Sequence, residues 1–418
     1  MVLAGAALSV LTPPASGYAL ITHQQLIDVV WDTSIEPLLL SRFPKASRAD
    51  LERAHAYAYG GCLVQDLGYY PFGKKIFSDF THYVRSGDFV LYLLRNARNP
   101  DELAFAVGAL SHYLGDSVGH PEAVNPSTAL SFPPLADKYG PVVTYEEAPR
   151  QHVRTEFGFD VAQTALHHFA PRKYRQQVGF AISPVLLARA FGQTYGLPIR
   201  SILGRRRPAI SSYRSSVRKV LPFFTEVAVI NARNKLSPSV ADAAHARFLE
   251  DSLQADYQRL WSNAYKRPGL GAHVVACIVR ILPKIGVLQL LSVKAPTPVT
   301  DDLYVRSVNL TLDRFRSLLA RLRTATFETL TLANLDLDTG STVRPGGYAL
   351  TDKTYETLLA KVTADPARPV PEGLRQDILT YYSDVTAPIA TKKHPKRWRK
   401  VQEELIVLAH AKATNPNP

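Results

Sequence analysis

Residues 100–121 read PDELAFAVGALSHYLGDSVGHP and combine a strong helical pattern with an unusual set of polar residues. Apolar residues recur at helical spacing from Pro100 to Leu114, which predicts a helix. His112 and Asp116 lie four residues apart, so a helix would place both side chains on one face. A glycine and a proline flank His120 and indicate that the helix ends there, which would turn this side chain toward the same cavity.

Helical periodicity recurs along most of the chain, so the predicted fold is all-α, a multi-helix bundle with an additional, mainly helical C-terminal region. A Pro-rich stretch, Asn125–Pro141, predicts a loop, and the Thr- and Gly-rich segment Thr331–Leu350 predicts a short hairpin. Ser47 and Asp50 form a capping pattern at the start of one helix. The other predicted helices are Leu20–Leu40, Ser47–Tyr59, Asp88–Asn96, Glu146–His168, Ser183–Tyr195, Ser212–Asn234, Pro238–Ala264, Leu303–Thr326, Asp352–Lys361 and Arg397–Lys412.

The composition is that of a globular protein. Of the 418 residues, 46% are hydrophobic and 20% charged, which excludes a disordered chain. The net charge of +13 is unevenly distributed: residues 1–160 hold 12 Lys and Arg against 17 Asp and Glu, and residues 161–418 hold 37 against 19. A basic balance favours anionic partners, namely nucleic acid, a membrane surface or phosphorylated small molecules.

The N-terminal residues 1–17, MVLAGAALSVLTPPASG, are typical of a signal peptide. An apolar core is followed by two prolines and then by small residues, so cleavage after Gly17 would make Tyr18 the first mature residue. The segment lacks a basic start, and a buried or frayed N-terminal arm is the alternative. A signal peptide would place the protein outside the cytoplasm, either secreted or periplasmic.

Histidines and carboxylates recur together in the first half of the chain. His152 and Glu156 repeat the four-residue spacing of His112 and Asp116 on a second predicted helix. Neutral imidazoles and carboxylates without cysteine favour zinc at a catalytic site over a structural Cys-rich zinc site. A single His–carboxylate pair of this kind is more often part of a packed core than of a metal site. The prediction of a metal site therefore depends on the order of all these residues along the chain.

This order resembles the zinc-dependent phospholipase C family. The matching pieces are T-H23, V-Q-D66, H82, S-H112-Y-L-G-D116, H120-P and H152-V-R-T-E156, over roughly residues 18–170. That family is related to the trinuclear-zinc nucleases that cleave single strands, and both groups are all-α secreted enzymes. The resemblance implies a phospholipase C-like domain at residues 18–200. Residues 201–418 match no motif and are expected to form a basic, mainly helical region of unknown role.

The resemblance also implies up to three zinc ions. The first zinc would be held by Asp66, His82, His112 and Asp116, and the second by His120, His152 and Glu156. The third would share Asp116 and add His23 with the amine and carbonyl of the mature N-terminus. Tyr18 stands where the relatives have Trp, and it can provide that amine only after the signal peptide is removed.

The implied reaction is hydrolysis of a phosphodiester, and a glycerophospholipid would give diacylglycerol and a phosphorylated headgroup. Zinc would acidify the attacking water and neutralise charge on the phosphoryl oxygens, while Asp66 would orient or deprotonate that water. Tyr69, Tyr70 and Phe72 would wall a substrate pocket by stacking, or else pack around the metal cavity. Two other functions stay open: a single-strand nuclease, for which nucleic acid is the substrate, and a non-catalytic, metal-stabilised binding protein.

Two features of the basic half suggest contact with a membrane surface. Val274–Leu291 is strongly apolar and would either dip into a bilayer or form a buried hairpin. A cluster of Lys and Arg around Trp398, residues 392–400, would touch anionic lipid or nucleic acid, or would simply begin a solvated helix. Asp336-Leu-Asp338-Thr-Gly340 resembles part of a calcium loop but lacks the other ligands, so we assign no metal to it. Sequence does not show whether Cys62 and Cys277 pair, nor the oligomeric state.

Overall fold

The computed structural model describes residues 18–204, 206–232, 242–255 and 294–414 of the chain. The predicted signal peptide, the apolar segment Val274–Leu291 and Cys277 lie outside these residues. Within them, Cys62 is a free, buried thiol. The helices in the described ranges are all too short or too polar to cross a membrane.

The described part of the chain is all-α, as predicted, with one two-residue parallel pair between β1 (Val370–Pro371) and β2 (Ala413–Thr414). The first half contains α2 Leu20–Val30, α3 Glu36–Arg42, α4 Arg48–Gly61, α5 Lys75–Tyr83, α6 Ser86–Asn96, α7 Pro100–Gly119, α8 Asn125–Ser131, α9 Pro133–Tyr139, α10 Pro149–Ala165, α11 Arg172–Val178, α12 Pro184–Tyr195 and α13 Ile199–Leu203. The second contains α14 Arg206–Ser215, α15 Leu221–Ala232, α16 Ala243–Gln254, α19 Pro298–Thr324, α20 Ala349–Thr363, α21 Glu372–Tyr381 and α22 Pro395–Ala409. Short 3₁₀ turns are η2 Val64–Tyr69 and η8 Ala390–Lys393, and π turns are η1 Trp31–Ile35, η3 His120–Val124 and η4 Ser216–Val220.

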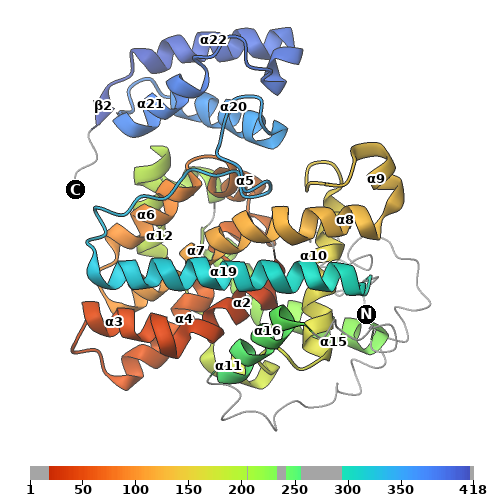
Figure 1. Cartoon of the computed structure of the whole chain (residues 1–418). Coiled ribbons are helices and arrows are strands. Elements are labelled where there is room, and N and C mark those ends of the chain that lie inside the picture. The colour runs from red at the N-terminus through yellow and green to blue at the C-terminus, as the bar shows by residue number, and fades with distance from the viewer. Residues whose placement is uncertain (1–17, 205, 233–241, 256–293, 415–418) are drawn as a thin grey trace, which may run out of the picture.

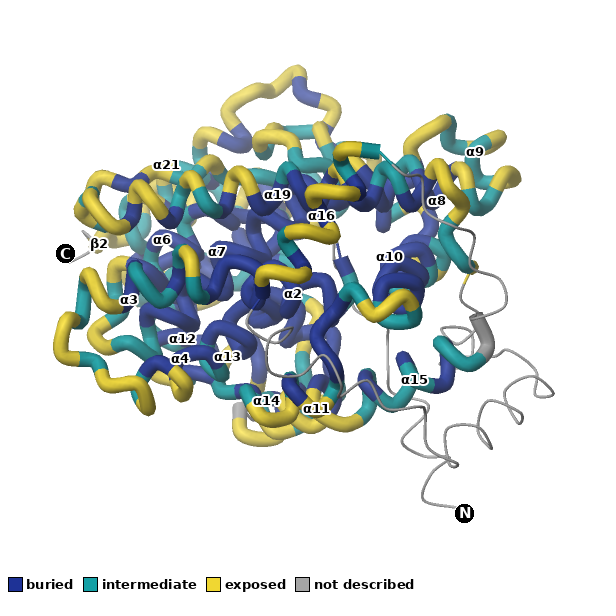
Figure 2. The backbone as a smooth tube through the Cα atoms, turned by 60° about the horizontal axis from the view of Figure 1, so that its bottom comes forward, coloured by how far each residue is buried: buried dark blue, intermediate teal, exposed yellow. Residues whose placement is uncertain are grey.

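Helix α7 forms the centre of the bundle and is buried along nearly its whole length (Figure 2). Its close neighbour is α4, and glycines make that approach possible. A Cβ atom on Gly108 would lie 2.2 Å from the carbonyl oxygen of Ala58, and one on Gly61 would lie 2.0 Å from that of Phe105. The backbones of α4 and α7 therefore pack directly against each other. This contact fixes the position of α7 along its axis relative to the end of α4.

The C-terminal helices pack on the same core. Helix α19 runs across the front of the bundle beside α7, and α20, α21 and α22 lie together at one end (Figure 1). One continuous cluster of buried apolar side chains extends from Tyr18 to Leu408. Residues of the predicted C-terminal region thus contribute to the same hydrophobic core as the first 200 residues. The predicted boundary at residue 200 is not tested by this and stays a prediction.

Several predicted elements differ in detail. The predicted helix Leu20–Leu40 contains a π turn, η1, between α2 and α3, whereas α7 ends at Gly119, directly before His120, as the flanking glycine and proline predict. The prediction of a loop at Asn125–Pro141 was wrong, because α8 and α9 occupy most of it. The Thr331–Leu350 segment has a single antiparallel bridge, between Leu335 and Thr342, in place of paired strands.

Candidate metal centre

Four donor atoms of the first group converge at the middle of the bundle. Asp66 lies on η2, His82 lies in the last turn of α5, and His112 and Asp116 face one another across one turn of α7. The Nε2 atom of His82 lies 3.4 Å from Asp66 Oδ1 and 3.4 Å from Asp116 Oδ2, and the Nε2 atom of His112 lies 3.1 Å from Asp116 Oδ2 and 3.3 Å from His82 Nε2. Bonds of 2.0–2.1 Å in a tetrahedral zinc site place neighbouring donors about 3.3 Å apart. The spacing of these four atoms therefore fits one zinc ion.

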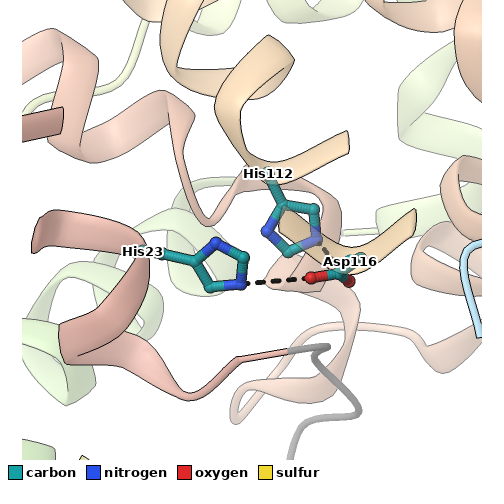
Figure 3. Close-up of side chains that lie close together, drawn as sticks. All are labelled: His23, His112 and Asp116. Atoms are coloured by element: carbon teal, nitrogen blue, oxygen red, sulfur yellow. Dashed lines mark ion pairs between the residues drawn. The ribbon is translucent and has the colours of Figure 1, made fainter. Parts of the chain in front are cut away.

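Asp116 is shared with His23, which belongs to the third group. Figure 3 shows His23, on α2, and His112, on α7, approaching Asp116 from two sides. The Nε2 atom of His23 lies 3.2 Å from Asp116 Oδ1, and the His23 ring stacks on His112 with centroids 4.4 Å apart. A Cβ atom on Gly115 would lie 3.1 Å from His23 Cε1, so the glycine of the H-Y-L-G-D stretch leaves room for this imidazole.

The second group lies on η3 and α10. The Nδ1 atom of His152 is 2.7 Å from Glu156 Oε1, and the Nε2 atom of His120 is 3.7 Å from the same oxygen. All three side chains are buried, with exposures of 2% or less, and none of these three atoms makes a hydrogen bond. Buried polar atoms are rarely left unsatisfied, so these donors indicate a ligand that the protein atoms do not supply.

Hydrogen bonds to the far side of each ring fix which nitrogen faces the centre. The Nδ1 atoms of His82, His112 and His120 donate to the carbonyl oxygens of Ser78 (2.8 Å), Cys62 (3.0 Å) and Leu337 (2.7 Å), respectively. A carbonyl oxygen accepts only, so each Nδ1 carries the proton and each Nε2 presents a lone pair. The Nε2 atom of His152 lies 2.8 Å from the Asn125 side-chain oxygen, which leaves its Nδ1 atom facing Glu156. Such outer contacts are the usual support of metal-binding histidines.

The buried carboxylates need positive charge. Burial would raise the pKa of Asp116, but His112, His23 and His82 hold the pKa of this carboxyl well below its usual range. Burial lowers the pKa of His23, and the neighbouring His112 lowers it further. Against the effect of burial, Glu156 and more distant carboxylates raise the pKa of His120 to about 10.

No lysine or arginine of the described residues forms an ion pair with Asp116 or Glu156. Protons on the imidazoles or bound cations are thus the groups that can balance these charges, and the two compete for the same atoms. The donor set of imidazoles and carboxylates suits zinc. Each of the eight predicted side-chain ligands falls in a group of three or more close potential donors.

A comparison with known families agrees with this geometry. Residues 22–203 match the family model for zinc dependent phospholipase C, and the match includes all eight of these side chains. The match covers 182 of the 418 residues, so the similarity to the zinc-dependent phospholipase C family is a property of this part of the chain. No curated protein and no solved structure gave a match. The match supports a zinc-dependent function of the phospholipase C type.

An apolar cavity lies against two of the candidate metal groups. Two of its lining residues are Asp66, of the first group, and Glu156, of the second. The other described residues that line it include no cation and only two hydroxyl-bearing side chains: Ala19, Leu20, Leu63, Tyr70, Val153, Phe157, Leu221, Phe224 and Thr225. Helix α15 and its first residue Leu221 close one wall and lie outside the matched range. The cavity thus has carboxylates of the first and second metal groups in its wall, and the rest of its wall is mainly apolar.

The three predicted substrate-binding aromatics occupy different places. Tyr70 lines the cavity, whereas Tyr69 is buried with its ring centre 6.1 Å from that of His82. Phe72 is 69% exposed and does not line this cavity. Tyr18 is buried, with its ring centre 5.9 Å from that of His23, and its hydroxyl donates to Ser307. A Cβ atom on Gly119 would lie 2.7 Å from the Tyr18 ring, so α7 is also shaped to admit this residue.

Sequence reasoning missed a loop of the C-terminal region that supports two of the groups. The peptide N–H of Leu337 donates to the carbonyl oxygen of His82 (3.1 Å), and its carbonyl oxygen accepts from His120 (2.7 Å). The carbonyl oxygen of Asp338 accepts from the side-chain amide of Asn125, whose oxygen contacts His152. The Asp338 carboxylate accepts from the hydroxyls of Tyr83 (2.9 Å) and Tyr348 (2.7 Å). The D-L-D-T-G stretch was set aside as an incomplete calcium loop, and it instead positions metal-group histidines.

Proposed function

We propose that this protein is a zinc-dependent phosphodiester hydrolase, and specifically a phospholipase C that cleaves glycerophospholipids to diacylglycerol and a phosphorylated headgroup. The family match over residues 22–203 and the three donor groups support the hydrolase assignment. The observation that carries the finer assignment is the apolar cavity beside Asp66 and Glu156. A phosphodiester held at these carboxylate-rich groups would place one of its substituents against hydrocarbon side chains.

In this proposal, bound zinc supplies the acidified water and the positive charge that stabilises the phosphoryl oxygens. The side chain of Asp66 lies where the first group meets the cavity, so it is the residue that would orient the water toward phosphorus or accept its proton. With zinc bound, His82 and His112 would present their inner nitrogens to the ion, because backbone carbonyl oxygens accept the proton of the outer nitrogen. The buried walls exclude bulk water and strengthen each electrostatic contact.

The composition of the cavity favours a lipid over a single-stranded polynucleotide. A polynucleotide carries further phosphates on both sides of the scissile bond, and proteins that bind one track it with a cationic groove. The described lining residues are mainly aliphatic and aromatic and include no Lys or Arg. Leu221 and Phe224 on α15 line the same space, whose volume of about 50 Å³ would admit a short hydrocarbon portion of a lipid.

The test is hydrolysis by a single zinc-loaded preparation of two substrates, a short-chain phosphatidylcholine and single-stranded DNA. The proposal expects release of phosphocholine from the lipid, with DNA cleaved far more slowly. Asp66→Asn should abolish lipid turnover, and Asp137→Asn, at an exposed carboxylate on α9, is the matched control that should keep it. Faster cleavage of DNA would favour the nuclease. Full zinc content without hydrolysis of any phosphodiester, including a chromogenic one, would favour a binding protein.

Export and N-terminal processing are part of the proposal. Tyr18 is packed beside His23 and α19, so a chain that begins at Tyr18 would bring a free amine close to the third group. We therefore propose a secreted or periplasmic protein from which residues 1–17 are removed. Mass spectrometry of the purified protein identifies the first residue, and an N-terminus other than Tyr18 would remove the amine ligand from the account.

A further inference from the structure

One face of α14 and η4 presents four cationic side chains without acidic partners. Arg207, Arg214, Arg218 and Lys219 are exposed, and none forms an ion pair among the residues that the structure describes. Together with Pro184, Ile210, Ser211 and Ser215 they line an open groove of about 570 Å³. We call these four residues the cationic face. On other surfaces, by contrast, arginines such as Arg247 and Arg316 pair with aspartates.

Exposed apolar side chains border the cationic face. Phe72 is 69% exposed and has a φ of 61°, a left-handed conformation that bulky residues rarely adopt. Its neighbour Pro71 accepts a hydrogen bond from Ser212 of α14, which holds this aromatic beside the cationic face. Val185, next to the groove-lining Pro184, is 62% exposed. A strained backbone that holds an aromatic ring in water indicates a partner for that ring.

The same run of helix leads from the cationic face to the metal groups. Helix α14 continues through η4 into α15, whose residues Leu221 and Phe224 line the cavity beside Asp66. Figure 2 shows α14 and α15 along one edge of the molecule. The chain around Phe72 makes the same connection, because Tyr70, two residues earlier, also lines the cavity.

From this arrangement we infer that the cationic face, with Phe72 and Val185, docks on an anionic phospholipid surface. Guanidinium groups bind lipid phosphates, and an aromatic ring beside them suits the boundary between headgroups and acyl chains. Nucleic acid would also attract the cations, but it gives no burial to Val185. This inference rests on the proposed function. Docking by the cationic face would bring the apolar cavity close to the membrane that carries the substrate.

The test is co-sedimentation of the full chain with vesicles of phosphatidylcholine alone or mixed with phosphatidylglycerol. Binding should require the anionic lipid and fall as NaCl is raised from 0.1 M, because salt screens surface charge. Arg207→Gln/Arg214→Gln/Arg218→Gln should weaken binding on the order of 100-fold, since each cation near such a surface contributes roughly a factor of five. Phe72→Gly should also weaken binding while relieving the left-handed backbone, so its thermal midpoint should not fall.

The matched control is Lys45→Gln/Arg98→Gln/Arg323→Gln, which removes the same charge from exposed positions outside the cationic face and outside the basic cluster at residues 392–400. It should weaken binding by less than about fivefold. Equal losses in the two triple variants, or no preference for anionic vesicles, would overturn the inference. The inference would also be overturned if the protein bound a single-stranded oligonucleotide more tightly than it binds anionic vesicles, and if the cationic-face variant lost that oligonucleotide binding. Sedimentation requires no turnover, so this result is independent of whether the hydrolysis assay succeeds.

Discussion

Asp338 is a buried carboxylate of the C-terminal region whose replacement tests how the second group is held. Its Oδ2 atom accepts hydrogen bonds from Tyr83 and Tyr348, and its backbone carbonyl accepts from Asn125. Its Oδ1 atom lies 3.9 Å from His120 Nδ1. Asp338→Ala removes the anchor of the loop whose carbonyl oxygens orient the second group, and it leaves every predicted ligand in place.

The size of the effect follows from these contacts. A buried hydrogen bond to a charged acceptor contributes about 1.5–3 kcal/mol, so loss of two should lower the free energy of unfolding by about 3 kcal/mol or more. Loss of the outer support of a metal-binding histidine typically lowers metal affinity by about 10–100-fold. We expect the zinc of the second group to be released first, while the first group keeps its ion.

The assay measures zinc per folded chain after dialysis against increasing chelator, together with urea unfolding of the same samples. Asp377→Ala is the matched control, because Asp377 also accepts a tyrosine hydroxyl, from Tyr355 at 3.0 Å, in the C-terminal region. The control should lose stability and keep its zinc. Asp338→Asn, which retains an acceptor for the two hydroxyls, should lie between Asp338→Ala and the unmodified protein. If Asp338→Ala lost stability but bound zinc within about twofold of the unmodified protein, the positioning role would be refuted.

Three further predictions concern the same centre and its surroundings. Gly115→Ala would place a Cβ atom 3.1 Å from His23 Cε1, so it should lower zinc content and turnover. Alanine favours the helix over glycine by about 1 kcal/mol, so helix stability should not account for the loss. Metal analysis measures the first effect and a thermal melt the second. Burial raises the pKa of Asp160 to about 6, so its contribution to stability is present below about pH 4 and is lost as the pH rises through 6. Asp160→Asn should remove this step from urea-unfolding curves recorded between pH 4 and 8, and an unchanged step would contradict the assignment. Removal of zinc by chelator should lower the thermal midpoint, since each ion at 1,000 times its Kd stabilises by about 4 kcal/mol, and a midpoint independent of chelator would argue against bound zinc.

Local signals predicted the centre of the fold well. The Ser47–Asp50 capping box is present as the sequence indicates, and α7 carries His112 and Asp116 on one face. These features depend on residues three or four positions apart, so they can be read without the tertiary structure. The Pro-rich stretch was misread because Pro126 and Pro133 each stand at the start of a helix, where a missing N–H costs nothing.

Long-range contacts could not be predicted in this way. His120 and Leu337, whose ring nitrogen and carbonyl oxygen are hydrogen-bonded, are 217 positions apart. No spacing rule relates the D-L-D-T-G loop to the histidines. Its resemblance to part of a calcium loop suggests a different kind of site. The expected hairpin is also replaced by contacts to helices: Ser86 on α6 exchanges hydrogen bonds with the backbone of Leu335, and Asn334 contacts Asp88. Tertiary packing thus decides the form of this segment.

The convergence of histidines and carboxylates on zinc is the central claim, and the number of ions in the native protein tests it most directly. Native mass spectrometry of the exported, folded chain counts the ions and identifies the first residue in one measurement. The account predicts three zinc ions in a chain that begins at Tyr18. A folded chain with fewer than two zinc ions would contradict it.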